Sequence, residues 1–387
     1  MHARPTVIPS VSKGEPRAHA RPKTALKPPD ALLLGSVAFL VALGLVMVFS
    51  SSSAIAYSYH HDTAFYLKRQ LMYLAVGLVL AYAAYRIDYR KLRTIAPWLV
   101  LITFVLLVLT LIPHVGYATG GARRWLGFRA LSFQPSELGK LALVMFLAAK
   151  LSQLGEGIRS LSRGVAPALF VTLLLAAPVF VEPDMGTASL YLFTAFALLF
   201  TAGARIEHLI MCTLVMLPAA AVAVGSSAYK RARILAFLNP WKDAQNTGYH
   251  TVQSLLALGS GGIFGLGLGA SRQKYFYLPE AYTDYIFAVL GEELGLLGCI
   301  AVIALFVLFA IRAVTLALKA PDRFGMLLAM GCTFMIAIQA FVNIGVVTSS
   351  WPVTGVPLPF ISFGGTSLIV SLIAVALIAN VGRHRTT

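Results

Sequence analysis

Residues 31–53 read ALLLGSVAFLVALGLVMVFSSSS and contain no charged side chain. A helix of about 20 apolar residues crosses the hydrocarbon core of a bilayer, so this stretch predicts a transmembrane helix. Nine further windows have the same character: 70–85, 95–113, 137–153, 165–181, 186–203, 207–227, 286–311, 326–347 and 363–381. We therefore predict an all-α, polytopic integral membrane protein with about ten transmembrane helices.

The composition of the whole chain supports this class. Of its 387 residues, 58% are hydrophobic and only 12% are charged, whereas about a quarter of the residues in soluble proteins are charged. This argues against a soluble enzyme, a disordered protein and a secreted disulfide scaffold. Cys212, Cys299 and Cys332 are far apart and lie in apolar runs, so we interpret them as buried apolar residues rather than metal or disulfide ligands.

The windows divide the chain into a membrane domain with a tail at each end. Residues 1–30 are predicted to be a disordered basic tail, 31–381 the membrane domain, and 382–387 a second short tail. A long hydrophilic loop, 228–285, separates the seventh and eighth spans. The apolar stretch 165–203 is interrupted only at 182–184, which predicts a tight hairpin with Asp184 capping the sixth span.

The basic residues are distributed unevenly around these spans. The chain has 31 Lys and Arg against 15 Asp and Glu, a net charge of +16. An even number of spans puts both termini on one side, and a cytoplasmic N-terminus places 19 of the 31 basic residues inside. Ten of the other 12 lie in 114–140 and 228–285. This cluster predicts an anionic ligand at the outer face, or contact with lipid headgroups, and nucleic acid is not needed to explain the charge.

The first outer region contains a basic motif and a carboxylate–ammonium pair. Arg123-Arg124-Trp125 combines forked hydrogen-bond donors with an interfacial aromatic ring, which suits a pyrophosphate. Ser136 is predicted to cap the fourth helix. Glu137 and Lys140 are three residues apart and share a helix face, so we expect them to pair, either as a structural ion pair or as part of a ligand site.

The second outer region contains a glycine-rich stretch followed by acidic residues. Residues 258–269 lack Gly-Lys-Ser/Thr, which argues against a nucleotide P-loop and favours a re-entrant or interfacial segment. Glu280 and Asp284 lie just before the eighth span, where Asp284 is either a helix cap or a functional carboxylate. Glu292 and Glu293 fall inside that span, where we expect one of them to pair or form a hydrogen bond within the bundle.

Several loop motifs resemble the SEDS family (shape, elongation, division and sporulation), which includes RodA and FtsW. The matching segments, in order, are Gly121-Ala122-Arg123-Arg124-Trp125, Phe133-Gln134-Pro135-Ser136-Glu137, Pro183-Asp184-Met185-Gly186-Thr187, Tyr277-Leu278-Pro279-Glu280-Ala281-Tyr282-Thr283-Asp284, Gly291-Glu292-Glu293-Leu294-Gly295 and Pro357-Leu358-Pro359-Phe360-Ile361-Ser362-Phe363-Gly364-Gly365. Asn239-Pro240-Trp241 and the segment 266–274 look more like the FtsW branch, whereas Gly248-Tyr249-His250 looks more like RodA.

The resemblance implies a peptidoglycan glycosyltransferase that polymerises lipid II at the outer face of the bacterial cytoplasmic membrane. It also implies a class B penicillin-binding protein as partner, with other division or elongation proteins and membrane lipid around it. A lipid II flippase would be expected to carry charged residues along a path at both faces. A scaffold acting through its basic tail is compatible with either activity. The polar clusters concentrate at the outer face, which favours the enzyme.

The resemblance also assigns candidate roles. The family's essential aspartate corresponds to Asp284, either as the base that accepts a sugar hydroxyl proton or as a ligand of Mg²⁺ or Mn²⁺. The candidate phosphate contacts are Arg123, Arg124, Lys140, Arg231 and Lys274. The remaining candidate substrate-binding residues are Trp125, Gln134, Ser136, Glu137, Glu280, Ser362, Gly364 and Gly365.

Overall fold

The computed structural model describes residues 27–119, 122–128, 131–226 and 228–385. Most of the predicted N-terminal tail and the last two residues lie outside these ranges. Each of the ten predicted windows coincides with a helix, which confirms the all-α class. These helices are α1 (Ala31–His60), α2 (Phe65–Arg86), α3 (Leu92–Leu111), α4 (Pro135–Leu151), α5 (Ala166–Val181), α6 (Met185–Thr201), α7 (Ile206–Gly225), α10 (Ile286–Leu318), α11 (Arg323–Val347) and α12 (Gly365–Arg383).

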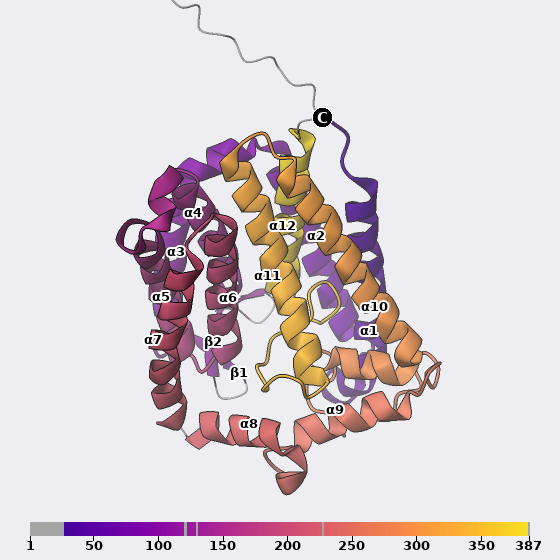
Figure 1. Cartoon of the computed structure of the whole chain (residues 1–387). Coiled ribbons are helices and arrows are strands. Elements are labelled where there is room, and N and C mark those ends of the chain that lie inside the picture. The colour runs from indigo at the N-terminus through magenta and orange to yellow at the C-terminus, as the bar shows by residue number, and fades with distance from the viewer. Residues whose placement is uncertain (1–26, 120–121, 129–130, 227, 386–387) are drawn as a thin grey trace, which may run out of the picture.

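Two further helices belong to the long loop between α7 and α10. These are α8 (Ala228–Leu238) and α9 (Tyr249–Ser260), and both lie across one end of the bundle (Figure 1). The described chain termini meet at the other end, where the Lys27 amide donates to the Arg383 carbonyl at 2.9 Å. Seven helical segments of the described chain are long and apolar enough to cross a bilayer, and α6 and the first part of α7 are shorter apolar helices. We call the two ends the loop end and the terminal end.

Helix α4 is the central element of the bundle. It packs on α3, α11 and α6, and also contacts α5 and α12. Almost every residue of α4 is buried, including Glu137 and Lys140. This central position keeps both charged side chains away from lipid, where an unpaired charge would be expensive.

Two predicted helix caps have different outcomes. Asp184 caps α6 as expected, because its carboxylate accepts the Thr187 amide at 3.0 Å. The prediction for Ser136 is wrong: α4 begins at Pro135 with Gln134 at the capping position. Proline is favoured at the first helical position because its missing N–H needs no partner there. Ser136 therefore lies in the first turn, and its buried hydroxyl has no hydrogen-bond partner in the described chain.

A small antiparallel sheet, which the sequence analysis did not predict, lies between α3 and α4. Its strands are β1 (Tyr117–Thr119), β2 (Ala122–Phe128) and β3 (Leu131–Phe133), with β2 in the middle. The strands are too short to produce a clear alternating pattern. Because successive side chains of a strand point to opposite faces, β2 separates Arg123 from Arg124.

The long helix α10 is broken at Gly295, inside the predicted span 286–311, and the sequence analysis did not predict this break. Gly295 has φ 67° and ψ −168°, a backbone conformation that favours glycine. A Cβ at Gly295 would lie 2.4 Å from the Ile263 carbonyl oxygen, so the glycine-rich segment packs directly on the broken helix.

This segment also supplies the hydrogen bonds that the break removes. The amides of Leu266 and Gly267 donate to the carbonyls of Glu292 and Glu293, both at 3.0 Å. In return, the Leu296 amide donates to the Gly262 carbonyl at 2.9 Å. The predicted re-entrant or interfacial segment thus acts as a backbone partner for a helix break, which satisfies groups that membrane burial would otherwise leave costly.

A buried polar network joins α1, α10 and the loop that follows the glycine-rich segment. Lys274 Nζ lies 3.1 Å from Glu293 Oε1, and both side chains are almost fully buried. The Ser50 hydroxyl donates to the same carboxylate at 2.6 Å, and Lys274 Nζ donates to the Gly269 carbonyl at 2.6 Å. Glu292 accepts the Ser271 hydroxyl. Glu293 therefore pairs within the bundle, as expected.

We expect Lys274→Met and Glu293→Gln each to lower the thermal unfolding temperature. Removing one partner of a buried ion pair leaves an uncompensated charge, which costs about 3–5 kcal/mol. The buried thiols of Cys299 and Cys332 allow unfolding to be followed with a thiol-reactive fluorophore in detergent.

The double variant should recover most of the loss, because neither charge remains. Lys68→Met is the matched control: Lys68 pairs with Asp62 on the surface, where it is 69% exposed, and such pairs contribute little. Unchanged melting of both single variants would contradict a stabilising role for the buried pair.

Candidate active site

A polar cavity of about 300 Å³ opens at the loop end of the bundle. Its walls come from α8, the start of α9, the loop before α10 and the loop between α11 and α12. Glu280 and Asp284, both predicted site residues, line it together with Arg233 and His250. The structure therefore brings the two acidic residues to one cavity, although they do not share a helix.

A tight turn presents Asp284 to this cavity. The Glu280 carbonyl accepts the amides of Thr283 and Tyr285, both at 3.2 Å, and Glu280 itself has φ 55°. A left-handed backbone at a residue other than glycine costs about 1–2 kcal/mol and is common near functional sites. Tyr285, not Asp284, occupies the capping position of α10, and it makes no side-chain cap. The alternative of Asp284 as a helix cap is therefore wrong.

The loop between α11 and α12 holds this turn in place. The Ser362 hydroxyl donates to the Thr283 carbonyl at 2.6 Å and accepts the Leu358 amide at 2.8 Å. The Phe363 amide donates to the Tyr282 carbonyl at 2.9 Å. Ser362, predicted to bind substrate, is instead occupied with positioning the residue next to Asp284.

A buried amide on α11 holds the Asp284 backbone. Asn343 Nδ2 donates to the carbonyls of Asp284 at 2.8 Å and Val356 at 2.7 Å. The Asp284 carboxylate itself forms no hydrogen bond or ion pair with the described part of the chain. Its backbone is therefore fixed while its side chain is left available to a ligand.

The environment of Asp284 raises the pKa of its carboxyl group toward neutrality. Burial, together with the negative charges of Glu280 and Asp184, raises its pKa to about 7. The cations of Arg124 and Arg233 oppose this rise. A carboxyl group with a pKa near the working pH is suited to accept and release a proton.

Arg124 and Arg123 have different environments because of the strand alternation in β2. Arg124 is half-buried, and its guanidinium donates to the carbonyls of Glu182 at 3.1 Å and Pro183 at 2.7 Å. Its charge also reaches Asp284. Arg123 is exposed on the other face of the strand, and Trp125 shares that face. The structure therefore brings only Arg124 of this motif to Asp284.

The same separation occurs on α8. Arg231 shares a helix face with Leu235 and Leu238, which are 65% and 70% exposed, whereas Arg233 lies with buried Ala236 and lines the cavity. Arg231 is the residue predicted to contact phosphate, but Arg233 is the one that lies at the site. The spacing of exposed leucines on α8 was the signal that distinguishes the two.

Lys274 is also not free to contact a phosphate at this cavity. Its ammonium is buried between Glu293, Ser50 and the Gly269 carbonyl. Its role in the structure is to join the loop to α1 and α10.

Glu137 and Lys140 form the predicted ion pair, with 2.7 Å between Lys140 Nζ and Glu137 Oε2. Lys140 Nζ also donates to Gln339 Oε1 at 2.5 Å. Gln339 Nε2 in turn donates to the Pro357 carbonyl at 2.9 Å, in the loop that holds Asp284. The pair is thus connected to the site through α11.

The remaining predicted residues lie where α2, α4 and α12 meet. The Gln134 amide donates to the Thr366 hydroxyl at 3.1 Å, and the Gly364 amide donates to Gln70 Oε1 at 3.4 Å. A Cβ at Gly365 would lie 2.4 Å from the Tyr73 ring. The described contacts of these residues are structural.

Sequence reasoning missed Gln339, Asn343 and His250. The first two are four residues apart on one face of α11, and both are nearly fully buried. The sequence feature that could have revealed them is the presence of two side-chain amides within an apolar span, since polar groups at membrane depth need partners. His250 was noted only as part of a branch motif, yet it lines the cavity.

The residues that line the site can be compared with those needed to bind the expected divalent cation. No group of three or more His, Cys, Asp or Glu side chains among residues 27–119, 122–128, 131–226 and 228–385 is arranged to hold a metal ion. Mg²⁺, however, commonly binds through one or two carboxylates together with substrate phosphates and water. Asp284 and Glu280 at one cavity fit that mode, and do not fit an all-protein metal site.

Known proteins similar to this chain belong to one family. The family model described as Cell cycle protein, named for FtsW, RodA and SpoVE, matches residues 30–387. Stage V sporulation protein E of Bacillus subtilis is 44% identical over 356 residues, covering 92% of this chain and 97% of the relative. A probable peptidoglycan glycosyltransferase FtsW of Geobacter metallireducens is 44% identical over 352 residues, covering 91% and 94%.

Solved structures show the same architecture. A chain of a peptidoglycan synthase complex, described as coordinating polymerization and crosslinking, superposes with a TM-score of 0.76 at 32% identity, covering 92% of this chain and 98% of that chain. RodA of Thermus thermophilus gives a TM-score of 0.68 at 31% identity, covering 93% and 98%. The chain therefore belongs to the family of FtsW, RodA and SpoVE, the SEDS family, as its loop motifs indicated.

Proposed function

We infer that this protein is a peptidoglycan glycosyltransferase that polymerises lipid II. The observation that carries the proposal is Asp284: its carboxylate forms no hydrogen bond or ion pair with the described residues, its backbone is held at a polar cavity, and two arginines are close enough to affect its pKa. Family membership and the names of the relatives from Geobacter support the same activity.

The proposed reaction joins two lipid-linked sugars. The Asp284 carboxylate accepts the proton of a sugar hydroxyl as its oxygen bonds to the anomeric carbon of a second lipid II. The bond from that carbon to the diphosphate breaks, and undecaprenyl diphosphate leaves with the electron pair. Arg124 and Arg233 supply positive charge near Asp284, where it would stabilise the leaving diphosphate.

Orientation follows from the charge distribution. The terminal end carries the larger share of basic residues, so we assign it to the cytoplasm and the loop end to the exterior. This places the cavity at the outer face of the bacterial cytoplasmic membrane.

A class B penicillin-binding protein would supply the transpeptidase as partner. The chain contains no Ser-x-x-Lys motif accompanied by Lys-Thr-Gly, the set typical of such enzymes. The structural likeness to a chain of a synthase complex that couples polymerization with crosslinking supports this assembly.

A divalent cation, Mg²⁺ or Mn²⁺, is part of the proposal. Asp284 and Glu280 would hold it together with substrate phosphates, and the ion would supply charge neutralisation at the diphosphate when bound.

We expect Asp284→Asn to lower glycan polymerisation by at least about 100-fold, the usual contribution of a positioned acid–base group. The assay is polymerisation of labelled lipid II by the purified protein with its transpeptidase partner. Asp62→Asn, which changes a surface carboxylate of the Lys68 pair, should retain activity. Full activity of the Asp284 variant would exclude the catalytic assignment, and lipid II translocation without polymer formation would favour a flippase.

The pH dependence of kcat/KM should follow the ionisation of Asp284. Because its pKa is about 7, activity should fall as pH decreases through 7 and level off above it. Glu280→Gln removes a negative charge and should shift the midpoint to lower pH. Arg233→Gln removes a positive charge and should shift it to higher pH.

Glu182 is the control for this profile, because burial raises its pKa to about 7 as well. If the midpoint belongs to Asp284, Glu182→Gln leaves it in place. Disappearance of the midpoint in that variant would assign it to Glu182 instead.

Removal of divalent cations by a chelator should reduce polymerisation, and added Mg²⁺ or Mn²⁺ should restore it. Polymerisation that is insensitive to the chelator would exclude the cation and leave the base role of Asp284.

A further inference from the structure

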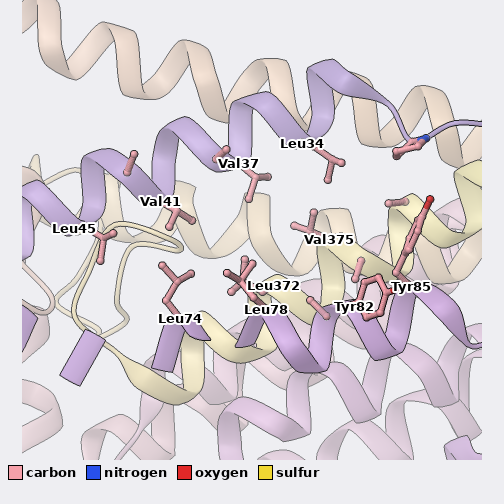
Figure 2. Close-up of a pocket in the computed structure, with 16 residues that line it drawn as sticks. Leu34, Val37, Val41, Leu45, Leu74, Leu78, Tyr82, Tyr85, Leu372 and Val375 are labelled. Atoms are coloured by element: carbon pink, nitrogen blue, oxygen red, sulfur yellow. The ribbon is translucent and has the colours of Figure 1, made fainter. Parts of the chain in front are cut away.

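An apolar groove of about 610 Å³ lies between α1 and the paired helices α2 and α12 (Figure 2). We call it the α1–α2–α12 groove. Helix α1 packs closely on α10, whereas α2 packs closely on α12, and α1 contacts this second pair less extensively. The space between the two pairs is lined mainly by leucine, valine and alanine side chains, and Tyr82 and Tyr85 carry the hydroxyl groups among the described lining residues.

The groove occupies one half of the membrane-spanning region. On α1 it extends from Leu34 to Leu45, which is about 16 Å along a helix axis. The hydrocarbon core of a bilayer is about 30 Å thick, so this length corresponds to about one leaflet. Most lining residues of α2 and α12 also belong to the terminal-end halves of their helices, and Leu74 and Leu372 lie near the midpoints.

Arginines surround the mouth of the groove at the terminal end. Arg86 donates to the Tyr82 hydroxyl at 3.1 Å, and Arg383 lies 4.4 Å from the Tyr85 ring centroid. Arg385 donates to the Pro28 carbonyl at 3.4 Å, next to Pro29, which lines the groove.

The carboxylate beside this mouth does not cancel their charge. Asp30 is paired with Arg312 and caps α1. The mouth therefore has a net positive charge, with two tyrosine rings at the depth where amphipathic rings favour the membrane interface.

We propose that the α1–α2–α12 groove binds an anionic phospholipid of the cytoplasmic leaflet, with its acyl chains in the groove and its phosphate among Arg86, Arg383 and Arg385. The groove is one leaflet deep, which matches a phospholipid and is too short for a transmembrane helix of a partner. Its mouth is at the opposite end from Asp284, so it is distinct from the site proposed for lipid II.

The test uses photoactivatable phosphatidylglycerol with a diazirine on its acyl chain, and the phosphatidylcholine analogue, in nanodiscs containing the full chain. Cross-linked peptides are mapped by mass spectrometry. We expect labelling of α1 and α2 by the phosphatidylglycerol probe in excess over the phosphatidylcholine probe. An interfacial cation contributes about fivefold to such a preference, so Arg86→Gln and Arg385→Gln should each reduce the ratio by about that factor.

A series of substitutions of increasing size on α1 fills the groove step by step. Ala38 lines the groove and is exposed to it, so Ala38→Leu, Ala38→Phe and Ala38→Trp should displace the probe progressively without disturbing the core. Ala304→Trp, on an exposed position of α10 outside the groove, is the control for added bulk. Arg93→Gln removes an exposed charge of α3, a helix that contributes no lining residue to the groove, and should leave the preference unchanged.

Equal labelling by the two probes would overturn the proposal, as would labelling of α1 and α2 that persists in Ala38→Trp. Competition by a polyprenyl diphosphate at lower concentration than phosphatidylglycerol would also overturn it and would assign the groove to the lipid-linked substrate. Binding is measured without substrate or partner, so its failure is distinguishable from loss of polymerisation.

Discussion

Backbone amides and carbonyls inside a bilayer have no water to form hydrogen bonds with, so they must be paired within the protein. The break of α10 at Gly295 leaves several such groups without their helical partners. The amides and carbonyls released there are paired with the segment 261–267, which fixes that segment against α10. The next residues continue into the buried Lys274–Glu293 pair, and from there the chain reaches the turn at Glu280. The position of Asp284 thus depends on satisfying the polar groups of a broken helix.

The carboxylates near the loop end differ in whether they have a partner, and this difference indicates which of them is available for chemistry. Glu137 and Glu293 each pair with a lysine, and Asp184 caps a helix and accepts the Thr187 hydroxyl. These three contribute to packing. Asp284 differs because its surroundings hold its backbone and leave its carboxylate to a ligand. The partners of these three carboxylates also keep the site from rearranging. If one of those partners moved to pair with Asp284, another buried charge would be left without a partner in a medium of low dielectric constant, which is costly.

The ten spans could be predicted because bilayer thickness imposes a length and composition that a single sequence displays. The candidate role of Asp284 came from the resemblance of its loop motif to the family. The orientation of side chains within short elements could not. Arg123 and Arg124 are neighbours in sequence, and only the strand β2 separates their faces. Lys274 resembled a phosphate contact because its partner Glu293 is 19 residues away and becomes adjacent only when α10 breaks. Long-range pairing of this kind leaves little trace in local patterns.

The charges around Asp284 have a consequence for the proposed mechanism. Arg124 and Arg233 lower the pKa of this carboxyl, and they are the cations proposed to stabilise the leaving diphosphate. A bound diphosphate would neutralise their field, so the opposition to proton uptake would weaken when the substrate is in place. The carboxylate would then be a stronger base in the loaded site than in the empty one. A cation at Asp284 has the opposite effect, because positive charge favours the ionised carboxylate. The two roles considered for Asp284 therefore differ in how substrate binding changes its affinity for a proton.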